Sequence, residues 1–383
     1  MAGNNGATPR VRRIALVLGG GGLKGFAHIG VLRALAEHGV LPSVFAGTSI
    51  GALIAAAHVG GMHVDEMERR ATSMRKTDLF RINHLGVLLE RMRASSLYME
   101  EPLRQLVSDA VLPGDFSALD GRLLVNTVDI ERGVPIVWGL PGLRDVAVAD
   151  AVYASCALPG YFPPGIVDDR TCVDGGVIDN LPAAIAAIGA DAVIAVDVGS
   201  SDLSHRSDIA SHGFAAVYMR AATVMMSALQ QTPLSSWRGP PMVLIRPRVS
   251  HVGWLTFTHT AELIAEGYRA ASAALATLDE CLAAPGGIHP RRTYHLSVNR
   301  NTCTGCGLCA AQAPTIMGLD DTGKAFPLAT EVEWSPADGQ FVSQCPVDAI
   351  AAEPVAASRV AVIPASPASP ASPGAVAPAK APQ

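Results

Sequence analysis

Gly47-Thr48-Ser49-Ile50-Gly51 lies where a short apolar strand, residues 44–46, gives way to an alanine-rich helix, residues 52–57. A serine on such a sharp strand-to-helix turn has its hydroxyl pushed out from the backbone. The glycines on either side let neighbouring chain pass close by, because they carry no Cβ atom. This GxSxG pattern predicts that Ser49 is a nucleophile in a fold that alternates strands with helices.

A second glycine-rich turn comes earlier in the chain. Gly19-Gly20-Gly21-Gly22-Leu23-Lys24-Gly25 follows an apolar strand, residues 14–18, and opens a helix that we expect to run to about His38. Four glycines leave backbone N–H groups unshielded at a helix N-terminus, where the helix dipole also favours negative charge. The loop is therefore predicted to bind an anion.

A nucleotide-binding turn is the alternative for this loop, and two observations argue against it. The sequence lacks the phosphate-binding motif GxxxxGK[ST], because Lys24 is followed by glycine and phenylalanine rather than by a hydroxyl residue. A dinucleotide site would also need an acidic residue at the end of a second strand, and residues 43–49 contain none. An oxyanion hole fits the loop better.

A third motif, Asp174-Gly175-Gly176, follows a short apolar run. In this order the three motifs resemble the patatin-like phospholipase family, whose members carry a glycine-rich oxyanion loop, a GxSxG serine and a DG[GA] aspartate. Residues 154–164 (ASCALPGYFPP) resemble the segment that these proteins place before the aspartate, and residues 180–182 (NLP) resemble the segment after it. The resemblance covers about residues 11–280 and is closest to the bacterial branch.

The resemblance implies a serine lipid acyl hydrolase of the phospholipase A or lysophospholipase type. It makes Ser49 the nucleophile, Asp174 its general base, and the N–H groups of Gly20, Gly21 and Gly22 the oxyanion donors. One such donor can stabilise the transition state by about 3 to 4 kcal/mol. The other motif residues support these positions: Lys24, Gly25, Gly47, Gly51, Gly175 and Gly176. For Lys24 the alternative is a solvated lysine on the first turn of a helix.

A carboxylate that works without histidine needs a raised pKa, since a free Asp ionises near pH 3.9. Partial burial beside apolar residues would raise that value. The alternative is a Ser-Asp-His triad, which would need a histidine after Asp174 in the chain. Those available within residues 11–284 are His205, His212, His251 and His259. None lies in a recognisable loop motif, so we favour the dyad.

Cysteine spacing near the far end marks a second site. Cys303, Cys306 and Cys309 form a CxxCxxC triplet, and Cys345-Pro346 follows after a long gap. The spacing resembles the single-cluster bacterial ferredoxins, which implies that these four cysteines ligate one iron–sulfur cluster. Because Cys306 is present, we expect a 4Fe-4S rather than a 3Fe-4S cluster. Zinc is the other candidate, but zinc ribbons usually pair CxxC with CxxC.

Charge and hydropathy bear on partners and location. Between residues 293 and 353 seven acidic residues face only Arg300 and Lys324, so a redox partner would present a basic face. The alternative is a solvated acidic surface. With a formal net charge of −5, we expect no nucleic-acid partner.

Thiolate ligands fit a reducing interior, and the N-terminal apolar run is too short for a signal peptide. We expect a cytoplasmic protein that touches the inner membrane surface transiently.

The expected organisation has five parts: a flexible arm (1–10), an acyl hydrolase domain (11–284), a linker (285–292), a ferredoxin-like domain (293–353) and a disordered Ala/Ser/Pro tail (354–383). We expect a three-layer α/β/α fold with a mainly parallel sheet, followed by a small α+β ferredoxin-like fold. An apolar stripe at helical spacing over residues 211–231 is assigned to core packing, with contact to a substrate acyl chain as the alternative.

Two other functions stay open from the sequence. One is an electron-transfer protein whose α/β domain is a lipid-binding scaffold, and the other is a lipid transacylase. Two hypotheses address the fusion of the domains: the oxidation state of the cluster alters access to Ser49, or the ferredoxin-like domain docks the hydrolase beside a redox partner.

Overall fold

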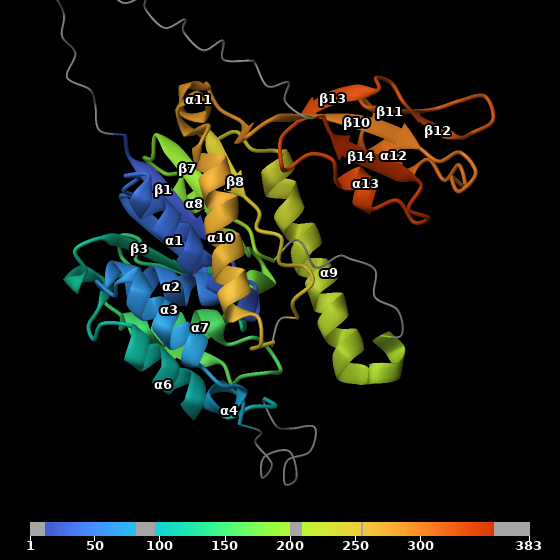
Figure 1. Cartoon of the computed structure of the whole chain (residues 1–383). Helices are drawn as coiled ribbons and strands as arrows, with labels where there is room; N and C mark the ends of the chain where they lie inside the picture. The colour runs from blue at the N-terminus through green and yellow to red at the C-terminus, as the bar shows by residue number, and fades with distance from the viewer. Residues whose placement is uncertain (1–11, 82–95, 200–208, 254–255, 356–383) are drawn as a thin grey trace, which may run out of the picture.

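The computed structural model describes residues 12–81, 96–199, 209–253 and 256–355 of the 383-residue chain. They form a large α/β region up to residue 289 and a smaller region from residue 292 onward (Figure 1). The expected arm at 1–10 and nearly all of the expected tail at 354–383 lie outside the described residues.

The large region is built on a nine-stranded sheet in the order β5-β6-β3-β2-β1-β7-β8-β9, with β4 also paired to β3. Every pair from β3 to β9 along this order is parallel. The pairs that involve β4, β5 and β6 are antiparallel. The mainly parallel sheet expected from the sequence is therefore confirmed. The strands are β1 (Ile14–Leu18), β2 (Val44–Thr48), β3 (Arg122–Asp129), β4 (Val134–Trp138), β5 (Gly165–Val167), β6 (Arg170–Asp174), β7 (Ala192–Val196), β8 (Met242–Ile245) and β9 (Ile288–His289).

The central strands are buried because helices cover both faces of the sheet. β1, β2 and β7 are short apolar runs in which every residue is buried. One face packs on α1, α2, α7 and α10, and the other packs on α8 and on the C-terminal end of α9. The helices are α1 (Ala27–Glu37), α2 (Ile50–Val59), α3 (Val64–Ser73), α4 (Lys76–Leu79), α6 (Glu101–Ala110), α7 (Val148–Cys156), α8 (Ala183–Ala186), α9 (Phe214–Ser235), α10 (Thr260–Leu275) and α11 (Leu278–Ala283).

Two boundaries differ from the sequence-based expectation. The helix predicted directly after the glycine loop begins with a 3-10 turn, η1 (Gly22–Phe26), and only then continues as α1. Part of the linker predicted at 285–292 belongs to the large sheet, because Ile288–His289 pairs with β8 as the edge strand β9. Both differences arise from tertiary contacts that a local pattern does not contain.

The smaller region has the α+β character that the sequence predicts. β10 (Arg292–Val298) lies between β13 (Glu331–Trp334) and β14 (Ile350–Pro354), and β11 (Met317–Leu319) pairs with β12 (Ala325–Pro327). All of these pairs are antiparallel. Two short helices, α12 (Leu308–Gln312) and α13 (Gln340–Ser343), complete it. Leu296, Trp334 and Phe341 lie in its core.

α9 lies between the two regions in Figure 1 and contacts both. Gln344 of the smaller region donates from Nε2 to Oε1 of Gln231 at 3.2 Å. Ala337 joins the apolar cluster that holds Leu234 at the end of α9. Among the helices in the described ranges, none is long and apolar enough to cross a bilayer.

Candidate active site

Ser49 occupies the turn between β2 and α2 in a strained backbone conformation. Its φ of 55° and ψ of −130° are rare for a residue with a side chain. The strain is held by hydrogen bonds: the Ser49 amide donates to Oγ of Ser155 at 2.9 Å, and that hydroxyl donates to the carbonyl of Asn126 at 2.7 Å. Residues from α7 and β3 thus fix the turn that carries the serine.

The flanking glycines are required by close packing. A Cβ atom on Gly51 would lie 2.1 Å from the carbonyl oxygen of Leu18, and one on Gly47 would lie 2.5 Å from the amide nitrogen of Ala52. Both distances are far inside van der Waals contact. α2 can therefore pack directly behind the serine only because these two positions lack side chains.

Asp174 ends β6 and lies beside Ser49, although the two residues are distant in the chain. Its side chain is buried, and Oδ1 accepts a hydrogen bond from the Gly176 amide at 2.8 Å. Burial raises the pKa of Asp174 to about 6, while the neighbouring Ser49 hydroxyl and the hydrogen bond from the Gly176 amide act in the opposite direction. The structure thus brings together the hydroxyl and the carboxylate singled out in the sequence.

The thiol of Cys156 is a third reactive group beside Ser49 and Asp174, and the sequence analysis did not single it out. It lines the same cavity as Ser49 and Asp174. Burial, reinforced by the nearby Asp174 carboxylate, raises the pKa of Cys156 well above its usual value. The thiol is therefore neutral at physiological pH and is no competing nucleophile. Cys172 and Cys281 are also buried.

The glycine loop passes directly over the serine, but its amides are not equivalent. A Cβ atom on Gly20 would lie 3.2 Å from Cβ of Ser49. Contrary to the sequence-based assignment of Gly20 as an oxyanion donor, its amide donates to the carbonyl of Asn180 at 3.1 Å. Gly21 and Gly22 line the cavity beside Ser49, and no acceptor for their amides is found in the described part of the chain.

Three buried polar residues shape this loop. Asn180 donates from Nδ2 to the carbonyl of Gly20 at 3.0 Å, so it holds Gly20 from both sides. Nε2 of His28 lies 2.8 Å from the carbonyl of Gly19, and burial lowers the pKa of His28 to about 4, so the ring is neutral. Lys24 is fully buried, which makes the solvated alternative wrong. Sequence reasoning missed the roles of His28 and Asn180, although it singled out the NLP segment.

The cavity above Ser49 has a volume of about 100 Å³ and mostly apolar walls. Leu53, Leu106 and Phe162 are among the residues that line it, together with Met226 of α9. Apolar walls with a few converging polar groups are typical of sites for small organic ligands. Here the polar groups are the Ser49 hydroxyl, the Asp174 carboxylate and the glycine amides.

The histidines proposed for a triad lie elsewhere or outside the described residues. His251 and His259 both contact the carboxylate of Glu262, at 2.8 and 2.9 Å, on the exposed start of α10. His205 and the side chain of His212 are outside the described part of the chain. Within the described part, no histidine lines the cavity that contains Ser49.

The apolar stripe predicted for the core in α9 faces outward, so the packing assignment is wrong. Six of its large apolar side chains are exposed: Phe214, Val217, Tyr218, Val224, Met225 and Leu229. Phe214 is 84% exposed and Met225 is 57% exposed. Met226, the next residue along, lines the cavity above Ser49 from the same helix.

The four cysteines of the second site line one small cavity in the smaller region, together with Leu308 and Ile350. Gly305 and Gly307, between the first three cysteines, adopt φ values of 75° and 76°, which favour glycine. Within the described residues, no three His, Cys, Asp or Glu side chains form a group that could hold a metal ion. The sulfurs thus line a space instead of converging on one point.

The surroundings of the cysteines suit sulfur ligands of a cluster. The Ala349 amide donates to Sγ of Cys345 at 3.3 Å. Hydrogen bonds from the amides of Ala325 and Gly305 lower the pKa of Cys303 below its usual value. N–H groups directed at sulfur stabilise thiolates and tune iron–sulfur clusters. The donor set and its second layer of contacts therefore fit an iron–sulfur group chemically.

Comparison with known families gives two matches. A patatin-like phospholipase model matches residues 16–187, and a 4Fe-4S single cluster domain model matches residues 296–352. An uncharacterized NTE family protein of Mycobacterium bovis is 35% identical over 197 residues, which is 51% of this chain and 52% of that protein. Patatin-like phospholipase domain-containing protein 7 of Rattus norvegicus is 35% identical over 210 residues, which is 52% of this chain and 14% of that protein.

The chain thus spans about half the length of the mycobacterial relative and a smaller share of the rat one. Among solved structures, VipD from Legionella pneumophila aligns with 71% of this chain and 67% of its own, at 15% identity and a TM-score of 0.38.

Proposed function

Since the chain carries a patatin-like phospholipase domain and a C-terminal 4Fe-4S single cluster domain, we propose that it is a serine lipid acyl hydrolase. Its activity would be of the phospholipase A or lysophospholipase type. The observation that carries this proposal is the placement of the Ser49 hydroxyl beside the buried carboxylate of Asp174, whose pKa is raised to about 6. A carboxylate with that pKa is ionised at neutral pH and is a stronger base than an exposed one.

In the proposed first half-reaction, Oγ of Ser49 attacks the ester carbonyl carbon while Asp174 accepts the hydroxyl proton. The carbonyl oxygen becomes an oxyanion, which the amides of Gly21 and Gly22 stabilise. The bond to the leaving alcohol then breaks, and protonated Asp174 returns the proton to that alcohol. In the second half-reaction, water attacks the acyl carbon while Asp174 accepts a proton from it. The bond to Oγ of Ser49 then breaks, Asp174 returns the proton to Oγ, and the fatty acid is released.

Positioning residues follow from the same contacts. Asn180 holds Gly20 by two hydrogen bonds, and His28 holds Gly19, so the loop keeps its amides over Ser49. We assign Gly20 to these positioning residues, because its amide already donates a hydrogen bond to the carbonyl of Asn180. A preformed oxyanion site costs no reorganisation when charge develops.

For the smaller region we propose that Cys303, Cys306, Cys309 and Cys345 hold a 4Fe-4S cluster, with 3Fe-4S as the alternative. When bound, such a cluster supplies one-electron transfer. Acidic side chains are exposed on this region, among them Asp321, Glu331 and Asp348, so the proposed redox partner presents a basic face. The cluster is consistent with the expected cytoplasmic location.

Transient contact with a membrane is proposed to involve α9. The helix has one charged residue, Arg220, in 22 residues, and its outer face is apolar. Through Met226 the same helix contributes to the cavity above Ser49. A lipid surface against this outer face would place substrate at the rim of the catalytic cavity.

The proposed nucleophile is tested with a fluorophosphonate probe and a lysophospholipid substrate. Wild-type protein is expected to bind the probe covalently and to release fatty acid. Ser49→Ala is expected to lose labelling and to lose turnover by at least about 10³-fold, because the nucleophile is gone. Ser43→Ala, at an exposed serine just before β2, serves as the control and should behave as wild type. Labelling that persists in Ser49→Ala would contradict the proposal.

A further inference from the structure

A second cavity lies between α2, α3 and α6, behind the one that contains Ser49. Its volume is about 530 Å³, and Ala57, Met67, Ala71 and Ala110 are among the residues that line it. That volume falls within the roughly 300 to 1,000 Å³ typical of ligand sites, whereas the catalytic cavity at about 100 Å³ falls below it. The larger space contains neither Ser49 nor Asp174.

The two cavities share a wall. The same five apolar side chains line both of them: Phe26, Ile50, Leu53, Met74 and Leu106. Ile50 directly follows Ser49 in the chain, and Leu53 lies one helical turn further along α2. A hydrocarbon chain that leaves the carbonyl carbon at Ser49 in this direction would therefore meet apolar surface only.

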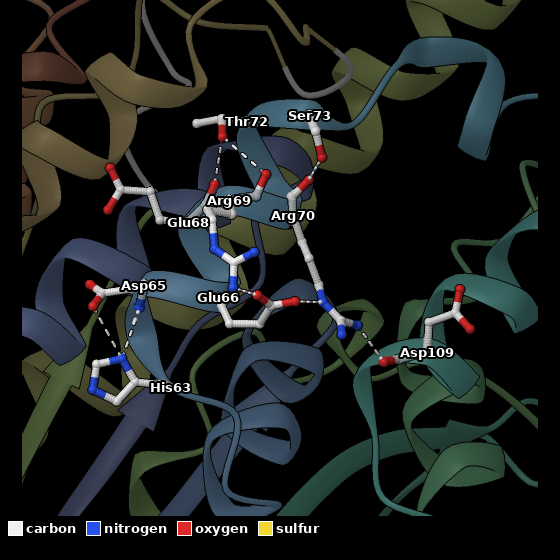
Figure 2. Close-up of polar contacts among 9 residues, drawn as sticks. All are labelled: His63, Asp65, Glu66, Glu68, Arg69, Arg70, Thr72, Ser73 and Asp109. Atoms are coloured by element: carbon white, nitrogen blue, oxygen red, sulfur yellow. Dashed lines mark hydrogen bonds and ion pairs between the residues drawn. The ribbon is translucent and has the colours of Figure 1, made fainter.

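Part of the lining of the second cavity is polar. Arg70 of α3 donates to Oε1 of Glu66 and to the carbonyl of Asp109, each at 2.6 Å, and so ties α3 to the C-terminal end of α6. Figure 2 shows the Arg70 side chain extended between these two partners. Arg70, Asp78 and Asp109 all line the cavity. An apolar tail should stop short of this rim, because covering it would desolvate charged groups.

We propose that the cavity between α2, α3 and α6 binds the acyl chain of the lipid substrate, and that the rim at Arg70 limits the length of that chain. This proposal rests on the acyl hydrolase function proposed above. The small side chains of Ala57 and Ala71, both buried, leave the space open. The ligand class is a long unbranched fatty acyl group.

The test uses Ala71→Phe in the full-length protein, which fills the cavity at a position remote from Ser49. Hydrolysis of 4-nitrophenyl butyrate should stay within about twofold of wild type, while kcat/KM for 4-nitrophenyl palmitate should fall by at least about tenfold, since an apolar pocket discriminates by about that factor for each methylene excluded. Ala276→Phe, at an exposed alanine after α10, makes the same substitution on the surface and should change neither rate. Equal effects on both esters, or none, would overturn the proposal.

A binding measurement separates this proposal from the catalytic one. Fluorescence titration of Ser49→Ala with cis-parinaric acid should show saturable binding, which the added Ala71→Phe substitution should weaken by at least about tenfold. This readout needs no turnover, so it stands even if wild type hydrolyses neither ester. Undiminished binding in the double variant would overturn the proposal. If Ala71→Phe lowers the melting temperature, the smaller substitution Ala57→Leu on the facing helix repeats both measurements with the same expected results.

Discussion

The loop beside Ser49 and the loop that carries the first three cysteines are both rich in glycine, yet different parts of the molecule hold them. Ser49 directly follows β2 and Asp174 ends β6, and these two strands are separated in the sheet by β3. Three of the four cysteines lie within seven residues, on the loop before α12 and on its first turn, and Cys306 is exposed. The first site depends on the register of a whole sheet, whereas the second depends mainly on local sequence.

The largest loss of activity is expected from a substitution at Asp174. Asp174→Asn should lower kcat by about 10² to 10⁴-fold, the range expected for loss of a general base. In wild type, kcat/KM should fall as the pH drops through about 6, because protonation of Asp174 removes the base. The Asn variant should show a flat profile over that range. A wild-type profile without a break between pH 5 and 7 would argue against Asp174 as the base.

Asp174→Asn should make the folded protein more stable although it lowers the activity. The pKa of Asp174 is raised on folding to about 6, so the folded state favours the neutral form and the buried carboxylate costs stability above that pH. Asp174→Asn should therefore raise the melting temperature at pH 8. The gain should shrink as the pH falls through 6 and vanish below about pH 4, where the carboxyl is neutral in both states.

Cys306→Ser tests whether the two sites are independent. Loss of one of four ligands should lower iron content by at least half and bleach the visible absorbance of the anaerobically purified protein. Hydrolysis of 4-nitrophenyl butyrate should change by less than about twofold, because Ser49 and Asp174 are held by the large sheet. Cys281→Ser, at a buried cysteine far from the triplet in the chain, controls for loss of a thiol. A comparable loss of ester hydrolysis in Cys306→Ser would show that the cysteine site and the Ser49 site are coupled.

The smallest effect is expected on the outer face of α9. Met225→Glu should weaken sedimentation with phosphatidylcholine vesicles by about fivefold, because it places a charge on an apolar face. Turnover of a short soluble ester should be unchanged. Ile188→Glu offers a matched control, since Ile188 is 58% exposed and Met225 is 57% exposed, but Ile188 lies outside α9. Equal loss of vesicle binding in both variants would refute the assignment to α9.

The parts of the fold that depend on short stretches of sequence could be predicted from the sequence. The predicted strand at residues 14–18 is β1 as observed, and the turn at Ser49 stands between a strand and a helix as its motif implies. Both features depend on short apolar runs and on glycine positions. The cysteines could also be assigned as one set, because three of the four lie within seven residues.

What the sequence missed depends on contacts between distant segments. The Gly20 amide donates a hydrogen bond to the carbonyl of Asn180. Nothing in the local GGGG pattern distinguishes Gly20 from its neighbours. Helical periodicity found the apolar stripe of α9 but could not tell whether protein or solvent faces it. β9 has only two residues, so its existence depends on β8 rather than on its own composition.

Ala337 has a consequence for how the chain can be divided. This residue belongs to the smaller region, yet it packs in the same apolar cluster as Leu234 and Met242 of the larger one. A protein that ended after residue 290 would therefore lose part of the packing on its large sheet. Apolar side chains would become exposed on the face of the sheet that α8 and the end of α9 cover. The truncated protein should therefore tend to aggregate in water.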